Sequence, residues 1–201
     1  MRRHRAAAPM FAGLLLLALM LLPPVRHATE SSMTTHMLVQ YPALMLAGGL
    51  LAQRWRGARP RWNELGITGL LAVALTMALL MVPRVLDLAL VDARVECVKV
   101  LALVASGAAL ALSWRRAGTV LQAFFLGNML PMAVVVGTLY QDSAVRVCNA
   151  YRLEDQQDLG AALVWLAAGI LVAWLLHLVA RQRSVRRSLP GEDAALPSAS
   201  R

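Results

Sequence analysis

Six long apolar segments run through the sequence, and polar residues separate them. Each holds about 20 residues with almost no charge, the length that an α-helix needs to cross roughly 30 Å of hydrocarbon at about 1.5 Å per residue. The apolar residues are continuous rather than alternating, which is typical of membrane helices and not of barrel strands. The predicted spans are 6–25, 34–53, 64–83, 97–114, 119–140 and 160–180.

The pattern changes in two places. Residues 84–96 alternate apolar with charged positions, which predicts a short amphipathic helix lying along the membrane between two spans. Residues 181–201 begin basic and end in Ser, Pro and Ala, which predicts a flexible cytoplasmic tail attracted to anionic lipid. The predicted architecture is therefore an all-α integral membrane protein, a six-helix bundle forming a single domain over 1–180, followed by the tail.

Composition supports the bilayer as the solvent. The chain has 201 residues, 59% of them apolar, and a mean hydropathy of +0.59, more apolar side chain than a soluble domain normally buries. Almost nothing remains between the spans from which a soluble domain could be built.

The net charge of +9 could suggest nucleic acid, but the position of the charges indicates a membrane orientation instead. If the N-terminus is inside, 14 of the 20 basic residues fall on the cytoplasmic side, and the opposite side sums to −2. This is the positive-inside pattern, and every loop agrees with it. We expect both termini in the cytoplasm, a multi-pass protein of the bacterial inner membrane, and no nucleic-acid partner.

The first segment also resembles a signal peptide, because basic residues precede its apolar run. Cleavage requires small residues at set positions, and Arg26 and His27 stand immediately before Ala28. The sequence therefore favours an uncleaved anchor.

The two cysteines, Cys97 and Cys148, are both predicted to lie on the external side. That compartment is oxidising in bacteria, so the first interpretation is a Cys97–Cys148 disulfide. A reversible dithiol or a soft-metal site is the alternative.

His36 opens the second span on the same side, with Met33 before it and Met37 after it. Thiolate, thioether and imidazole groups suit Cu(I), so these three residues, with the cysteines, form a candidate copper site. Gln40 follows His36 by four residues, which places both side chains on one helical face. The alternative is that His36 is a hydrogen-bonding anchor at the membrane interface.

Polar residues also interrupt the spans. Lys99, the one lysine of the sequence, stands a turn inside the fourth span and can reach outward toward Glu96 or Asp92. Gln122 and Asn128 lie in the fifth span, where unpaired amides are costly, so we expect them to face neighbouring helices. A ligand pathway is the alternative for these two amides.

Two segments resemble the CtaG family of cytochrome oxidase assembly factors. They are His-Met-Leu-Val-Gln at 36–40 and Asp-Gln-Gln-Asp-Leu-Gly at 155–160, the second leading to Trp165. The resemblance covers roughly 34–174, and the family pattern has a second histidine where this chain has Gln40. It implies a multispan membrane protein linked to copper delivery during maturation of haem-copper oxidases, with oxidase subunits as partners.

The resemblance and the residues together predict a CtaG-like factor for oxidase maturation that handles copper at the external face. The alternatives are an accessory subunit of a larger membrane complex and a small-molecule transporter that uses Gln122 and Asn128. No phosphate-binding loop, paired-histidine zinc helix or nucleophile elbow is present, so we do not expect an enzyme.

Overall fold

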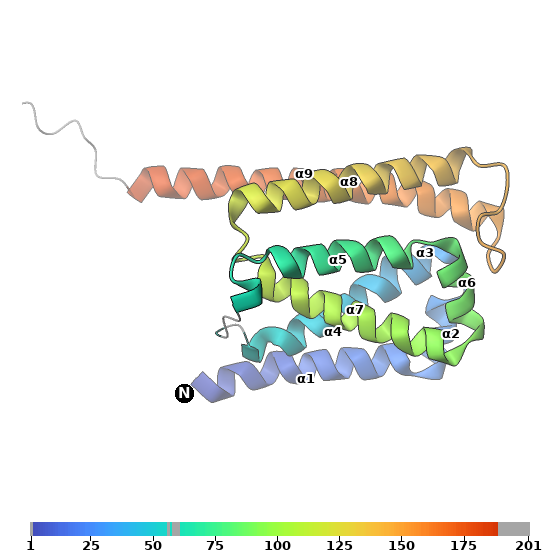
Figure 1. Cartoon of the computed structure of the whole chain (residues 1–201), viewed down its shortest axis with the longest axis horizontal. Helices are drawn as coiled ribbons and strands as arrows, with labels where there is room; N and C mark the ends of the chain where they lie inside the picture. Colours follow the sequence, from blue (N-terminus) through green and yellow to red (C-terminus); the bar gives the residue numbers. More distant parts are fainter. Residues whose placement is uncertain (1, 56, 58–60, 189–201) are drawn as a thin grey trace, which may run out of the picture.

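The computed structural model describes residues 2–55, 57 and 61–188, and every regular element among them is helical. The predicted all-α class is therefore confirmed (Figure 1). In chain order the elements are α1 (Arg2–Leu21), α2 (Pro23–Thr29), α3 (Met33–Thr35), the π-helix η1 (His36–Gln40), α4 (Tyr41–Leu51), the 3₁₀ turns η2 (Ala52–Trp55) and η3 (Arg61–Asn63), α5 (Ile67–Leu80), α6 (Pro83–Val91), α7 (Ala93–Ser113), α8 (Gly118–Asp142) and α9 (Leu153–Ser188).

The prediction of six uniform spans is not supported. Within the described residues, α7, α8 and α9 are each long and apolar enough to cross a membrane. The count rises to five if each of two bent pairs, α1 with α2 and α5 with α6, forms one span. The predicted span 34–53 is missing from this count because its helical path is divided among α3, η1 and α4.

Prolines explain both bends. Pro23 begins α2 and Pro83 begins α6, and each pair of helices is bent by 75° at that point. Proline is well suited to the first turn of a helix and cannot continue the helix before it, because it lacks the amide hydrogen. The short helix predicted within 84–96 is thus present as α6, and it turns away from α5.

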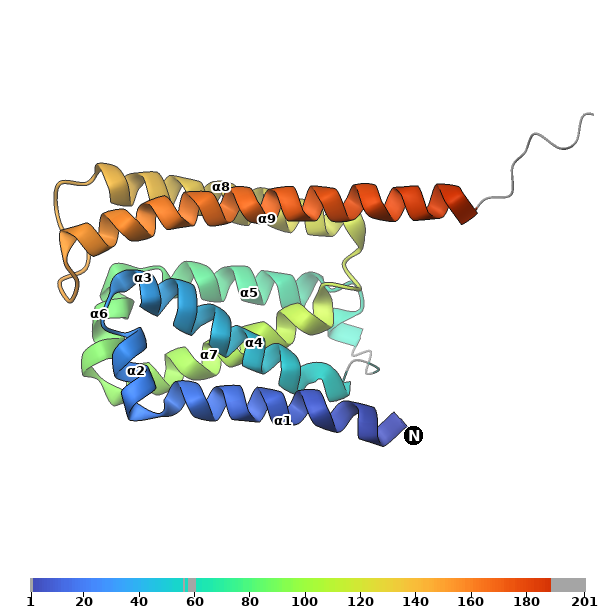
Figure 2. The same cartoon turned by 180° about the vertical axis from the view of Figure 1, so that it is seen from behind.

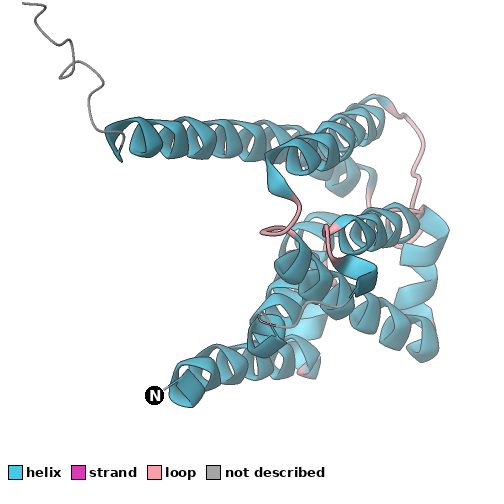
Figure 3. Cartoon of the chain, turned by 60° about the vertical axis from the view of Figure 1, so that its left-hand side comes forward, coloured by secondary structure: helices cyan, strands magenta, loops and turns pink. Residues whose placement is uncertain are grey.

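The helices form a body and a separate hairpin. Within the body, α4 packs against both α1 and α7, and α5 packs against α7. Helices α8 and α9 pack mainly on each other and form a second layer beside the body, as Figure 2 shows from behind. Figure 3 shows that the two parts diverge along most of their length.

The body depends on a close crossing of α4 and α7. Gly48 of α4 and Gly107 of α7 lie at this crossing, where an added Cβ would collide with the backbone of Val104 and Met45, respectively. Small residues let membrane helices approach to backbone contact, so dispersion and not water exclusion holds this interface.

The hairpin is joined to the body at both ends. At one end, Gln122 Nε2 donates to the carbonyl oxygen of Trp114, 2.7 Å away, across the short link between α7 and α8. At the other end, Thr34 Oγ1 of α3 donates to the carbonyl oxygen of Asp155 in α9 at 3.4 Å. We call this second end, formed by α2, α3, α6 and the α8–α9 connection, the cluster end.

The final helix is longer than predicted. α9 has 36 residues and continues to Ser188, so the first part of the predicted flexible tail is helical. Residues 189–201 of that tail lie outside the described residues.

Candidate functional site

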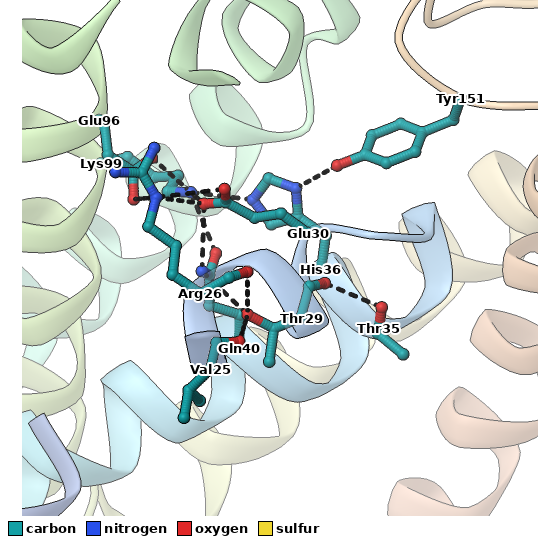
Figure 4. A network of polar contacts seen from close by, with 10 residues as sticks. All are labelled: Val25, Arg26, Thr29, Glu30, Thr35, His36, Gln40, Glu96, Lys99 and Tyr151. Carbon is teal, nitrogen blue, oxygen red and sulfur yellow. Dashed lines mark hydrogen bonds and ion pairs between the residues drawn. The ribbon is translucent and has the colours of Figure 1, made fainter. Parts of the chain in front are cut away.

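A buried lysine organises the cluster end of the body. The side chain of Lys99 is fully enclosed, although it carries the most strongly hydrated type of cation. Its Nζ donates to Gln40 Oε1 at 3.0 Å and lies 2.9 Å from His36 Nε2 and 2.7 Å from Glu96 Oε2 (Figure 4). The ammonium thus makes two hydrogen bonds and one close ion pair inside the protein.

The π-helical turn explains how two acceptors reach the same ammonium. Residues His36–Gln40 form η1, the wider helix that often marks functional sites. The side chains of His36 and Gln40, at the two ends of this turn, are both buried, and both contact Lys99 of α7. The prediction that these two side chains share one face is confirmed.

Lys99 and Glu96 stand three residues apart on α7, one turn of the helix. The predicted approach of Lys99 to Glu96 is therefore confirmed, but the lysine does not extend outward to the interface. Its side chain turns into the protein because His36 and Gln40 supply hydrogen-bond acceptors and Glu96 supplies the opposite charge, in place of water.

A second pair of charges closes the group. Arg26 Nε of α2 contacts both carboxylate oxygens of Glu30, at 3.0 and 3.1 Å, and lies 3.8 Å from Glu96 Oε1. Glu30 Oε1 in turn lies 3.6 Å from Lys99 Nζ. These contacts join α2, η1 and α7. We call the six residues the Lys99 cluster: Arg26, Glu30, His36, Gln40, Glu96 and Lys99.

Charge is balanced within the Lys99 cluster. Two cations face two carboxylates, so the formal sum is zero when all four are ionised. Burial by itself raises the pKa of Glu30, but hydrogen bonds from Arg26 and Gln40 and the charge of Lys99 outweigh it, and the pKa falls below its ordinary value. A buried group of charges is stable only when it is paired in this way.

The contacts define the state of His36. An ammonium has no lone pair, so His36 Nε2 accepts from Lys99 and the ring proton sits on Nδ1. From there Nδ1 donates to Tyr151 Oη, 2.6 Å away in the α8–α9 connection. The imidazole thus links the Lys99 cluster to the hairpin, and both of its nitrogens are engaged.

This arrangement does not fit a metal at His36. A metal ion needs the lone pair of a ring nitrogen, and the Nε2 lone pair points at an ammonium that would repel the ion. Within the described residues, no group of three His, Cys, Asp or Glu side chains is placed to hold a metal. His36 therefore has no free lone pair to offer a copper ion.

The other candidate ligands separate into two groups. Met33, Met37 and Cys148 are buried in one apolar core together with Tyr151. Cys97 is exposed on α7, and both cysteines are free thiols, so the predicted disulfide is absent from the structure. The two cysteines sit in different environments: Cys97 faces outward, and burial, with the nearby charge of Asp87, raises the pKa of Cys148 to about 11.

The Asp-Gln-Gln segment begins the last helix, as its sequence indicates. Asp155 lies in the first turn of α9, where an acidic side chain favours the exposed amides. Gln156 is buried; its Oε1 accepts from the amide of Val147 at 2.8 Å, and its Nε2 donates to the carbonyl oxygen of Tyr140 at 3.2 Å. It therefore fastens the loop between α8 and α9. Trp165, further along α9, is 78% exposed.

Three partners in this region were not identified from the sequence. Arg26 and Glu30 stand four residues apart in a short polar segment, a spacing that signals an ion pair on a helix. Nothing in the sequence around Tyr151 indicates that it reaches His36, because 115 residues separate them.

Comparison with protein-family models, with curated proteins and with solved structures found no match for this chain. The three to five candidate spans among the described residues indicate an all-helical membrane protein.

Proposed function

We propose that this chain is a CtaG-like membrane factor that assists the maturation of a haem-copper oxidase in the bacterial inner membrane. It acts by binding a partner subunit at the cluster end and not by holding copper on His36. One observation carries the proposal: α3, which leads directly into the first CtaG-like segment (36–40), packs at this end against α9, which holds the second segment (155–160).

Direct contacts between the two regions support the proposal. Thr34, next to the first segment, donates to the carbonyl oxygen of Asp155 in the second. His36 contacts Tyr151, which lies just before the second segment. Segments that the sequence separates by more than a hundred residues thus meet at one end of the protein, which is the external end if the arginine pattern gives the orientation.

The loop between α8 and α9 supplies an accessible face at this end. Val145 is 73% exposed, and nearby Asn149 and Ala150 are held through their amides by the carboxylate of Asp87 in α6. An exposed loop fixed on a rigid support is a common way to present a binding surface.

The experiment is deletion of the gene in its bacterium, followed by measurement of oxidase activity and of the haem spectrum in isolated membranes. We expect a loss of assembled oxidase that the wild-type chain restores. The Cys97→Ala variant is the matched control and should restore assembly, because this thiol is exposed and is not one of the six residues of the Lys99 cluster. The Lys99→Met variant should restore less per molecule of chain in the membrane.

Copper supplementation forms the second arm of this experiment. If added copper restores oxidase in the deletion strain, the chain handles copper and the partner-binding mechanism is wrong. If oxidase assembly is unaffected by the deletion, the proposed function itself is wrong.

The alternative function is an accessory subunit of a mature membrane complex. The fully paired Lys99 cluster favours it, since a closed group of charges can serve to hold helices in register without binding anything. Affinity purification separates the two functions: an assembly factor accompanies immature oxidase and leaves the finished enzyme, whereas an accessory subunit remains in constant ratio with it.

A further inference from the structure

The fifth predicted span, α8, exposes a polar side chain at membrane depth. Asn128 lies ten residues from the start of α8, about 15 Å along the axis and so close to the middle of the hydrocarbon. Its side chain is exposed and does not face a neighbouring helix of this chain, contrary to the expectation from the sequence. Gln122, in contrast, does find a partner within the body.

The hydrogen-bonding capacity of Asn128 is only partly used. Nδ2 donates to the carbonyl oxygen of Phe124 at 2.7 Å, one turn back on the same helix. A carboxamide has a second N–H and an acceptor oxygen, and neither has a partner within the part of the chain that the structure describes. Exposing such groups to lipid costs free energy that an interhelical hydrogen bond would recover.

A second acceptor lies next to it. Pro131 has no amide hydrogen, so the carbonyl of Gly127, four residues earlier, lacks its helical donor. Gly127 is exposed, and a Cβ added there would meet no atom within 4 Å. Another helix could therefore approach this carbonyl closely.

These groups belong to a face that α9 leaves uncovered. Phe124, Asn128, Met132 and Val135 recur at helical spacing and are exposed, whereas Gly137 packs against Gly160 of α9 on another side of α8. Only 11% of the most apolar stretch of α8 is buried inside the protein, compared with 33% of the corresponding stretch of α7.

We propose that α8 pairs with α8 of a second copy of this chain through Asn128. The patch is self-complementary: each copy offers a free amide hydrogen on Asn128 and acceptor oxygens on Gly127 and Asn128. A two-fold axis passing beside Asn128 lets each copy donate to the other, which is how identical surfaces pair in a symmetric dimer. Side-chain amides are known to hold membrane helices together in this manner.

Cysteine cross-linking tests the pairing. In a Cys97→Ala/Cys148→Ala background, Phe124→Cys places a thiol on the proposed interface and leaves Asn128 intact. Leu75→Cys is the matched control, because it is 59% exposed on α5 at a comparable depth. Under mild oxidation in native membranes, we expect a disulfide-linked dimer from position 124 and none from position 75.

Substitution of the amide completes the test. Asn128→Leu should lower the rate of cross-linking at position 124 about tenfold, while Asn128→Gln should retain it; helix content measured by circular dichroism should stay unchanged in both. Equal cross-linking at positions 124 and 75, no effect of Asn128→Leu, or a cross-link at position 124 to a different protein would each overturn the proposal.

Discussion

Lys99 Nζ lies 2.9 Å from His36 Nε2, although 63 residues separate the two in the chain. This contact determines what the cluster end can do. It assigns the lone pair of Nε2 to the ammonium and the ring proton to Nδ1, and it directs the imidazole to Tyr151. Both ring nitrogens of the predicted copper ligand are therefore engaged within the protein.

Removal of the lysine charge should destabilise the protein strongly. Lys99→Met leaves Glu96 and Glu30 without their shared cation inside the protein, and breaking a buried ion pair from one side costs about 3–5 kcal/mol. Lys99→Met/Glu96→Gln should lose less than the sum of the two single variants, because it restores charge balance. Unfolding in detergent micelles measures all three; additive losses would contradict the pairing.

Tyr151→Phe and Tyr41→Phe form a matched pair. Tyr151→Phe removes the acceptor of His36 Nδ1 and should cost about 1–3 kcal/mol, because a buried donor is left unpaired. Tyr41 is also buried beside His36, but its hydroxyl has no hydrogen-bond partner among the described residues. Tyr41→Phe should therefore be neutral or stabilising. Equal losses in the two variants would show that the His36–Tyr151 contact adds nothing.

The crossing of α4 and α7 should tolerate no side chain at its centre. Gly107→Ala places a Cβ into the backbone of Met45 and should disrupt packing of the body, with a loss of several kcal/mol. Gly49→Ala is the control on α4, since its Cβ would meet ordinary contacts at 3.4 Å and beyond. Thermal unfolding of the purified variants distinguishes them, and similar stabilities would contradict the close approach.

Glu30 should make the free energy of unfolding depend on pH in the acidic range. The pKa of its carboxyl is lower in the folded protein than its ordinary value of 4.5. Stability from this group is therefore complete above pH 4.5 and declines as the pH falls through the lowered pKa. The difference in unfolding free energy between wild type and Glu30→Gln should shrink over that window. A difference that stays constant would show that Glu30 carries no folded-state charge interaction.

Contacts within one helix were predictable from the sequence, whereas contacts that depend on neighbouring helices were not. The shared face of His36 and Gln40, and the approach of Lys99 to Glu96, follow from spacing along single helices and were predicted correctly. The inward direction of Lys99 was not predictable, because it depends on Glu30 and His36 arriving from other elements.

The failures have similar causes. Apolar length predicts a span but does not reveal where a proline bends it or where a π-turn divides it. Six uniform spans were therefore predicted, whereas the described part of the chain supports three to five. Topology placed both cysteines on one side of the membrane, yet their environments differ, and no disulfide joins them. Asn128 was expected to face a helix of its own chain, and it faces outward.

The state of His36 tests the account most directly. In ¹⁵N NMR of histidine-labelled protein, with His36 assigned by comparison with His36→Gln, we predict a protonated Nδ1 and an unprotonated Nε2. Both signals should stay unchanged when one equivalent of Cu(I) is added under reducing conditions. A proton on Nε2, or a change in either His36 signal on adding Cu(I), would contradict the assignment of this nitrogen to Lys99.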